Sequence, residues 1–301
     1  MILSDLPLTD DHLGEIITRL KTLPHPFEPL PETPATAVTS RSFHKSATPI
    51  QDQSYMISQG CYGLSQDKPI GTQHVGNCVA IILRNPQTNL TSLIHFDAHT
   101  DPKSLDKVFQ AFEGQPIEAA IIGAKYAETT DQKFKGYYQD TSRTNLLNVL
   151  SILAARNVNL TSAWVADINQ PHAFIITPKS GQMEVGAPSI SDPEQNILFA
   201  TRYFSSNNQA IALAYDLTHS TERALMPLDT ETIDFFNRFE EATRTKNKEG
   251  LDEWMIANKR NPDDLPFFTS MLKHYQASQT TDQSAQGITT EQTAAISLIP
   301  H

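Results

Sequence analysis

The sequence of 301 residues is long enough for one large domain or two small ones with a substantial core. The formal net charge of −11 disfavours electrostatic binding to nucleic acid or to anionic membranes, although it permits a cationic substrate. The N-terminal residues lack a basic stretch followed by an apolar core, and every apolar run is too short to span a bilayer. With only Cys61 and Cys78 available for disulfides, we expect a cytoplasmic protein in a reducing compartment.

Segments with helical and with strand periodicity alternate along the chain, so the sequence predicts a mixed α/β fold. Apolar residues recur at helical spacing in residues 10–23, 142–157, 191–204, 229–239 and 263–275. Apolar, β-branched runs predict strands at residues 78–83, 91–97, 117–123, 162–168, 172–185 and 209–216. A turn at Asn85-Pro86 separates the first two of these strands, so we expect them to pair as a hairpin.

Composition divides the chain into three parts. Residues 1–64 hold the first helix and a proline-rich connection, which we expect to pack on the core. Residues 65–275 carry the remaining predicted elements and form the main domain. Residues 276–301 are rich in Gln, Thr, Ser and Ala, so we expect a mobile polar tail.

The run Asp-Ala-His-Thr-Asp at residues 97–101 raises a metal hypothesis. It resembles the metal-binding segment of the arginase and agmatinase ureohydrolases, and His74 precedes it. Carboxylates and imidazoles suit a bridged pair of hard divalent ions. The second pair of aspartates is missing, however, because Thr218 stands where a carboxylate is needed after Asp216. A dinuclear site would lack half of its ligands.

A single zinc ion held by His74, Cys78, His95 and His99 is a further alternative, because the first pair and the second pair are each four residues apart. That spacing aligns ligands on one face of a helix, whereas both pairs straddle the ends of predicted strands. We therefore expect no metal.

Cys78 and His95 suggest a different chemistry. Cys78 follows a tight Val-Gly-Asn turn at the start of a predicted strand, and His95 lies in the strand that returns beside it. An imidazole within hydrogen-bond reach of a thiol favours the nucleophilic thiolate. Gly76 would allow an unusual backbone angle and the close approach of a substrate. Cysteines are usually structural when buried, and we interpret Cys61 in this way.

The string around Cys78 resembles the active-site pattern of the chemotaxis receptor glutamine deamidases. That pattern reads Thr-x3-Gly-x-Cys-Val-Ala, then Arg-x-Pro, then a histidine seventeen residues after the cysteine. It is carried here by Thr72, Gly76, Cys78, Val79, Ala80, Arg84, Pro86 and His95. Small residues at 119–124 are also similar to that family, and the resemblance covers residues 65–190.

Protein N-terminal asparagine amidohydrolases, a second family of the same fold, resemble the chain over a greater length. They place the cysteine at a similar distance from the start, and they carry an aspartate two residues after the histidine, as at Asp97. The likeness continues through residues 192–204 and 210–228 to about residue 275. The sequence departs from this family at Ala98 and His99, around the cysteine, and in the polar tail.

The resemblance implies a layered α/β sandwich of mixed β-sheets with outer helices. It further implies a cysteine amidohydrolase, in which Cys78 is the nucleophile, His95 is the base and then the acid, and Thr72 orients His95. Gly76, Asn77 and Asp97 are the expected substrate-binding residues. Asp97 either faces a substrate ammonium, holds His95 in its tautomer or caps the following helix. No metal or organic cofactor is needed.

The substrate implied is an N-terminal asparagine of a peptide or protein, which becomes an aspartate that degradation pathways can recognise. An alternative is a protein glutamine or asparagine side-chain deamidase, including an exported bacterial effector. More remote alternatives are the dinuclear-metal ureohydrolase and a non-catalytic binding module of the same fold.

Overall fold

A computed structural model describes residues 1, 3, 6–27, 54–190, 209–218, 230–258, 262, 265, 266, 268, 269, 271–273, 275 and 276. The chain divides into two compact units, which are Met1–Ser191 with Ser205–Met226, and Asp192–Phe204 with Pro227–His301. The helix predicted at residues 191–204 and the tail beyond residue 276 lie outside the described residues.

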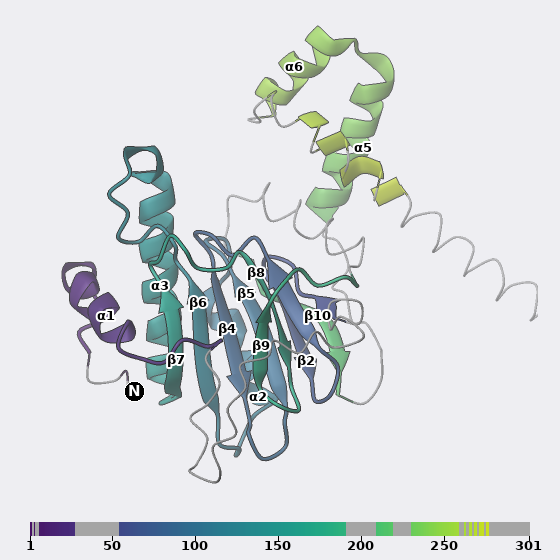
Figure 1. Cartoon of the computed structure of the whole chain (residues 1–301). Helices are drawn as coiled ribbons and strands as arrows, with labels where there is room; N and C mark the ends of the chain where they lie inside the picture. Colours follow the sequence, from purple (N-terminus) through teal and green to yellow (C-terminus); the bar gives the residue numbers. More distant parts are fainter. Residues whose placement is uncertain are drawn as a thin grey trace, which may run out of the picture. The chain divides into compact units, whose positions relative to one another are not determined.

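Two mixed β-sheets form the centre of the first unit (Figure 1). The strands are β1 (Tyr55–Met56), β2 (Cys61–Ser65), β3 (Ile70–Gln73), β4 (Val79–Arg84), β5 (Thr91–Phe96), β6 (Glu118–Gly123), β7 (Asn159–Val165), β8 (Ala173–Thr177), β9 (Gln182–Val185) and β10 (Ala212–Leu217). The larger sheet has the order β10-β2-β5-β4-β6-β7, and the smaller has the order β1-β3-β8-β9. Neighbouring strands are antiparallel except in the pairs β1/β3, β2/β10 and β6/β7.

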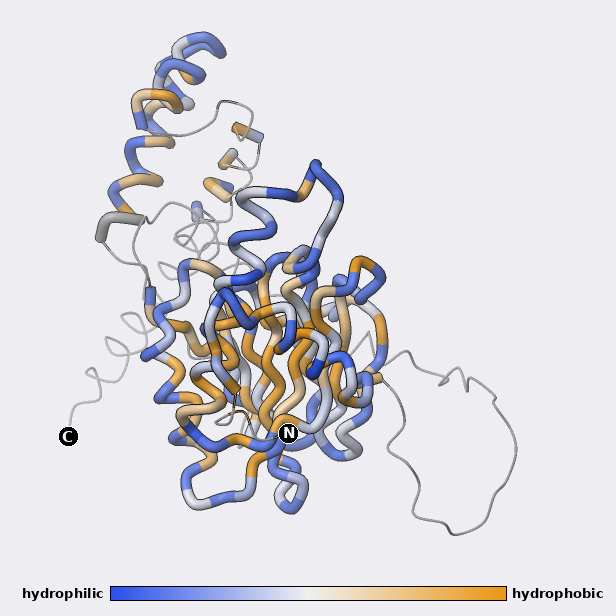
Figure 2. The backbone as a smooth tube through the Cα atoms, turned by 90° about the vertical axis from the view of Figure 1, so that its left-hand side faces the viewer, coloured by the Kyte–Doolittle hydropathy of each residue, from blue (hydrophilic) through white to orange (hydrophobic). Residues whose placement is uncertain are grey.

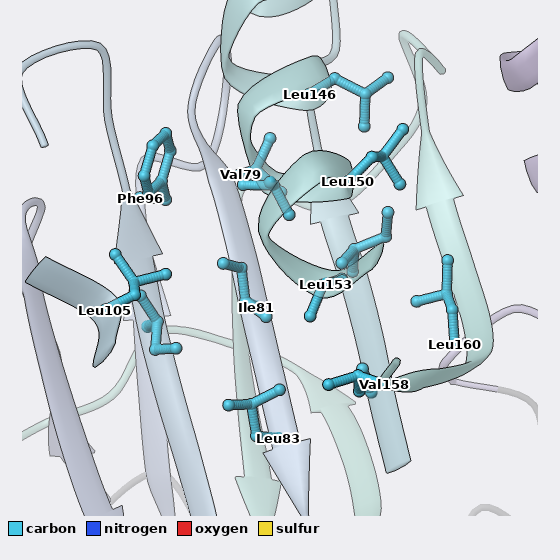
Figure 3. Packing of buried hydrophobic residues seen from close by; sticks show 14 of the residues in the cluster. Val79, Ile81, Leu83, Phe96, Leu105, Leu146, Leu150, Leu153, Val158 and Leu160 are labelled. Carbon is cyan, nitrogen blue, oxygen red and sulfur yellow. The ribbon is translucent and has the colours of Figure 1, made fainter. Parts of the chain in front are cut away.

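Helices cover one face of the six-stranded sheet. They are α1 (Leu13–Leu20), α2 (Asp106–Gln110) and α3 (Tyr137–Ala155), with the 3-10 turns η1 (Asp10–His12), η3 (Pro102–Leu105) and η4 (Gln132–Phe134). Because side chains alternate along a strand, every second residue of β4 faces this layer. Figure 3 shows them against α3, and the buried cluster includes Val79, Ile81, Leu83, Leu146, Leu150 and Leu153. The predicted first helix is confirmed, and its four apolar residues are buried in the same core.

The intervening residues of the large sheet are buried on its opposite face, where the small sheet lies. Ile82 and Leu93 are at most 2% exposed. Ile57, between β1 and β2, lies so close over Gly63 of β2 that a Cβ at that glycine would come within 2.4 Å of the Ile57 side chain. Figure 2 shows the hydrophobic residues concentrated in these central strands. Helices, a six-stranded sheet and a four-stranded sheet therefore form three layers, which confirms the predicted layered sandwich.

The hairpin predicted around Asn85 is confirmed. Strands β4 and β5 pair antiparallel, and the Asn85 side chain accepts a hydrogen bond from Gln87 N at 2.8 Å in the turn between them. Strands β2 and β3 are not predicted by the sequence. They are five and four residues long, and each contains a glycine, so they carry little periodic signal.

The second unit contains α5 (Thr230–Thr245) and α6 (Lys248–Ala257). Its core is rich in aromatic rings and consists of Phe235, Phe236, Phe239, Met255, Phe268, Met271, Leu272 and Tyr275. The helix predicted at residues 229–239 is thus confirmed and extends six residues further. Neither these helices nor any others among the described residues combine the length and apolar character needed to cross a membrane.

We predict that Gly123→Ala lowers the free energy of unfolding by about 2–5 kcal/mol. Gly123 has a φ of 139°, and an added Cβ would lie 2.2 Å from the carbonyl oxygen of Cys78. Gly14→Ala in α1 is the matched control, since no atom lies within 4 Å of its added Cβ. It should raise the same free energy by about 0.5–1 kcal/mol. Urea unfolding of the full chain measures both, and equal stabilities would contradict the prediction.

Candidate functional site

Cys78 directly precedes β4, in a loop that is held by main-chain hydrogen bonds. Its carbonyl oxygen accepts from Ala124 N at 2.8 Å, and the Gly76 carbonyl accepts from Lys125 N at 2.9 Å. Since Val79 faces the helices, alternation turns the Cys78 side chain towards the small sheet. The residue is 5% exposed, so its side chain is almost completely buried on that face of the sheet.

His95 lies on the same face of the large sheet as Cys78. In the antiparallel register of β4 and β5, His95 pairs with Ala80, two residues after Cys78. Cys78 and His95 are therefore diagonal neighbours, whose Cα atoms are about 7–8 Å apart with closer Cβ atoms. That separation is within reach of an imidazole, and His95 is completely buried.

Thr72 of β3 determines which ring nitrogen of His95 carries the proton. The Thr72 hydroxyl donates to the carbonyl oxygen of Ile57 at 2.7 Å, and its oxygen lies 2.7 Å from His95 Nδ1. A hydroxyl has one proton, and the carbonyl can only accept, so Thr72 must accept its second bond from Nδ1–H. In the neutral ring, Nε2 then bears the lone pair that can take a proton.

Asn77 connects the loop before β4 (residues 74–78) to the helical layer. Its carbonyl oxygen accepts a hydrogen bond of 2.9 Å from Nδ2 of Asn145, a fully buried residue of α3. Its own side-chain oxygen lies 3.8 Å from the Cys78 sulfur. The loop is thus fixed from β6 on one side and from α3 on the other.

Asp97 holds the turn that follows β5. One carboxylate oxygen accepts from the Thr100 hydroxyl at 2.6 Å and from His99 N at 3.2 Å, while the other accepts from Gln59 Nε2 at 3.0 Å. Only 1% of the residue is exposed. These bonds give Asp97 a capping role, and its proposed contact with a substrate ammonium stays a prediction.

The metal-like run at residues 97–101 consists of two consecutive capping aspartates. Asp101 accepts from Lys103 N at 3.0 Å and begins η3, just as Asp97 begins the preceding turn. Across the described ranges of the chain, no three His, Cys, Asp or Glu side chains are grouped closely enough to hold a metal ion.

The expectation of an unusual backbone angle at Gly76 is wrong. The residue of this turn in the left-handed region is His74, with a φ of 63°, whereas the φ of Gly76 is not positive. Gly76 N instead donates to the His74 carbonyl at 2.9 Å and closes a tight turn. Its missing side chain still leaves space, because a Cβ there would meet only the Tyr126 ring, at 3.7 Å.

Lys125 and His172 form a hydrogen-bonded pair beside the loop. Lys125 Nζ is 2.9 Å from His172 Nε2, and Val75 N donates to the His172 carbonyl at 3.0 Å. Burial lowers the pKa of Lys125, although the charge of Asp167 opposes this effect. Burial, followed by the charges of Lys125 and His74, lowers the pKa of His172 below 6.5. Lys125 can only donate, so His172 Nε2 accepts this hydrogen bond, and the lowered pKa favours the neutral ring that can do so.

A cavity of about 610 Å³ opens where β6 and β7 end, and Lys125 lines it from the side of the loop. Opposite charges meet in its wall, where Lys21 and Glu128 form an ion pair of 2.7 Å. Hydrogen bonds from Asn169 N and from Trp164 Nε1 lower the pKa of the Asp167 carboxyl, which also lines the cavity. The cavity can thus receive a polar or charged group, although neither Cys78 nor His95 lines it.

Asn145, Lys125 and His172 are not predicted by the sequence. The sequence did contain a sign of Asn145, because this polar residue lies four residues before Val149, on the buried face of α3. Lys125 and His172 had none, since each follows or precedes a strand as an ordinary loop residue.

The fold and the site define a layered α/β protein with a cysteine and a histidine on adjacent strands of its larger sheet. No family model matches the sequence. The chain is 30% identical over 125 residues to Uncharacterized protein RC0134 of Rickettsia conorii, and the match covers 40% of this chain and 72% of that protein. The chain belongs to the same family as that protein.

We predict that Thr72→Val lets His95 populate both neutral tautomers, because Nδ1–H loses its buried acceptor. The free energy of unfolding should fall by about 1–3 kcal/mol, since the Ile57 carbonyl also loses its donor. Proton–nitrogen NMR of the imidazole measures the tautomers. Thr72→Ser keeps the hydroxyl and should behave as the wild type. A single Nδ1–H tautomer in both variants would show that Thr72 is dispensable.

We predict that Lys125→Met raises the pKa of His172 towards its ordinary value, because a neighbouring positive charge is removed. Lys125→Arg keeps the charge and should keep the pKa low. An NMR titration of His172 measures the change, and identical curves for the two variants would contradict it. In the wild type, His172 binds a proton more readily in the unfolded chain than in the folded one. The free energy of unfolding therefore falls as the pH drops below about 6.5.

Proposed function

We propose that this protein is a cysteine amidohydrolase that converts a carboxamide to a carboxylate with release of ammonia. The observation that carries the proposal is the buried hydrogen bond between Thr72 and His95 Nδ1 at 2.7 Å, which leaves Nε2 as the unprotonated nitrogen of a ring on the same sheet face as Cys78. The resemblance of residues 72–95 to the deamidase pattern supports the same conclusion.

In the proposed reaction, His95 Nε2 takes the proton of the Cys78 thiol, and the sulfur attacks the amide carbon. The tetrahedral oxyanion is stabilised by the Cys78 backbone N–H and a neighbouring donor. His95 then gives its proton to the leaving nitrogen, ammonia departs, and a thioester remains. A water molecule, deprotonated by His95, attacks the thioester, so the products are a carboxylic acid and the regenerated thiol.

The first candidate substrate is an N-terminal asparagine of a peptide or protein. The likeness to the N-terminal asparagine amidohydrolases extends over most of the chain, and the net charge of −11 favours the approach of a cationic amino terminus.

A specific observation favours a second candidate, an internal glutamine or asparagine side chain. Lys125 lies beside the loop before β4, and its ammonium would repel that of a free amino terminus. Asp97, the expected partner of such an ammonium, already accepts bonds from Thr100, His99 and Gln59. An internal amide brings no second charge to this position.

Mass spectrometry of three peptides treated with the purified protein tests the proposal. One peptide begins with asparagine, one begins with glutamine, and one carries both residues internally. We expect the amide of the first to become an acid, and Cys78→Ala should lower the rate by about 10³-fold or more. Cys61→Ala is the matched control for loss of a thiol. Cys61 follows Gly60, whose N–H donates to the His95 carbonyl at 2.9 Å, but it is fully buried, so we expect its loss to lower the rate far less than Cys78→Ala does.

The outcomes separate the candidates. Conversion only of the internal peptide would move the assignment to a protein side-chain deamidase. If the wild-type protein converted none of the three peptides, or if Cys78→Ala converted them at the wild-type rate, the proposed function would be wrong.

A further inference from the structure

Asn145 is a buried polar residue whose hydrogen bonds do not offset the free-energy cost of burying its amide group. It lies in α3 with no exposed surface, and its amide nitrogen donates to the Asn77 carbonyl at 2.9 Å. Its amide oxygen is buried and has no hydrogen-bond partner among the described residues. An unsatisfied buried acceptor costs about 1–3 kcal/mol, so an apolar side chain would suit stability better here.

The hydrogen bond from Asn145 controls the orientation of the peptide group that joins Asn77 to Cys78. No peptide bond in the described part of the chain is cis, and in a trans peptide the carbonyl and the N–H point in opposite directions. With the Asn77 carbonyl held towards Asn145, the Cys78 N–H must point away from α3. The Cys78 side chain also lies on the face of the sheet that is turned away from the helices.

Other bonds hold the loop in place without fixing this peptide. Lys125 N binds the Gly76 carbonyl, and Ala124 N binds the Cys78 carbonyl, so the peptide units on either side are anchored by β6 and the residues after it. The unit between them, which contains the Cys78 N–H, is held through its carbonyl by Asn145.

We infer that Asn145 is a positioning residue for the oxyanion that forms on the substrate. It aims the Cys78 N–H by holding the opposite end of the same peptide. The inference rests on the proposed amidohydrolase function, in which that N–H binds the tetrahedral intermediate. Asn145 itself touches neither the substrate nor the reacting atoms.

The test compares amide hydrolysis with alkylation of Cys78 by iodoacetamide. Both reactions need the Cys78 thiolate, but alkylation displaces iodide and forms no oxyanion. In Asn145→Ala we expect kcat to fall about 10- to 100-fold, less than for direct loss of an oxyanion donor. KM should change by less than about threefold, because the bound substrate amide carries no negative charge.

The alkylation rate of Cys78 and its pH profile should stay within about twofold of the wild type. Mass spectrometry of the Cys78 peptide distinguishes this thiol from Cys61, which is fully buried. Asn145→Leu restores the lost volume and should show the same kcat, so the test does not depend on one variant folding. Ser142→Ala is the matched control, since Ser142 is also buried in α3, one turn earlier, and makes no bond to the loop among the described residues.

Three results would overturn the inference. If kcat were unchanged in Asn145→Ala and Asn145→Leu while the wild type remained active, the inference alone would be wrong. If hydrolysis and alkylation fell together in both variants, Asn145 would have only a structural role in the loop. If the wild-type protein hydrolysed none of the peptides, the proposed function would fail, and this role would fail with it.

Discussion

The candidate site depends on one buried hydrogen bond, between Thr72 on the small sheet and His95 on the large one. Because the Thr72 proton is committed to the Ile57 carbonyl, the bond can form with only one tautomer of His95. The same bond joins the two sheets at the point where the candidate nucleophile lies. This bond therefore couples the packing of the two sheets to the tautomer of His95. A shift of the small sheet would remove the acceptor for His95 Nδ1–H.

The loop before β4 is organised by hydrogen bonds of the same kind. The carbonyl groups of Gly76, Asn77 and Cys78 are held by donors from two parts of the chain: Lys125 N and Ala124 N after β6, and the Asn145 side chain in α3. Gly123 makes this arrangement possible, since any side chain there would collide with the Cys78 carbonyl. The loop is thus held at three successive peptide groups and lies directly beside the Lys125–His172 pair.

Much of the fold follows from local pattern. The helix at Leu13–Leu20 and the β4/β5 hairpin could be predicted because their apolar residues repeat at helical or strand spacing, with a turn signal at Asn85. Strands β2 and β3 could not, because short segments with glycine have no such signal and are stabilised by their neighbours in the sheets. The expectation of an unusual backbone angle at Gly76 was wrong, because the residue of this turn with a positive φ is His74, at 63°.

The sequence by itself determined the elements with a clear periodic signal, the hairpin that places Cys78 near His95, and the apolar face of the first helix, because all of these depend on residues close together in the chain. Only the tertiary structure decided what surrounds that pair. Asn77 and Asn145 are 68 residues apart, and Lys125 and His172 are 47 residues apart. No local pattern specifies such contacts. They exist because burial of three apolar layers brings distant polar groups together, and each group must then find its hydrogen bonds inside the protein.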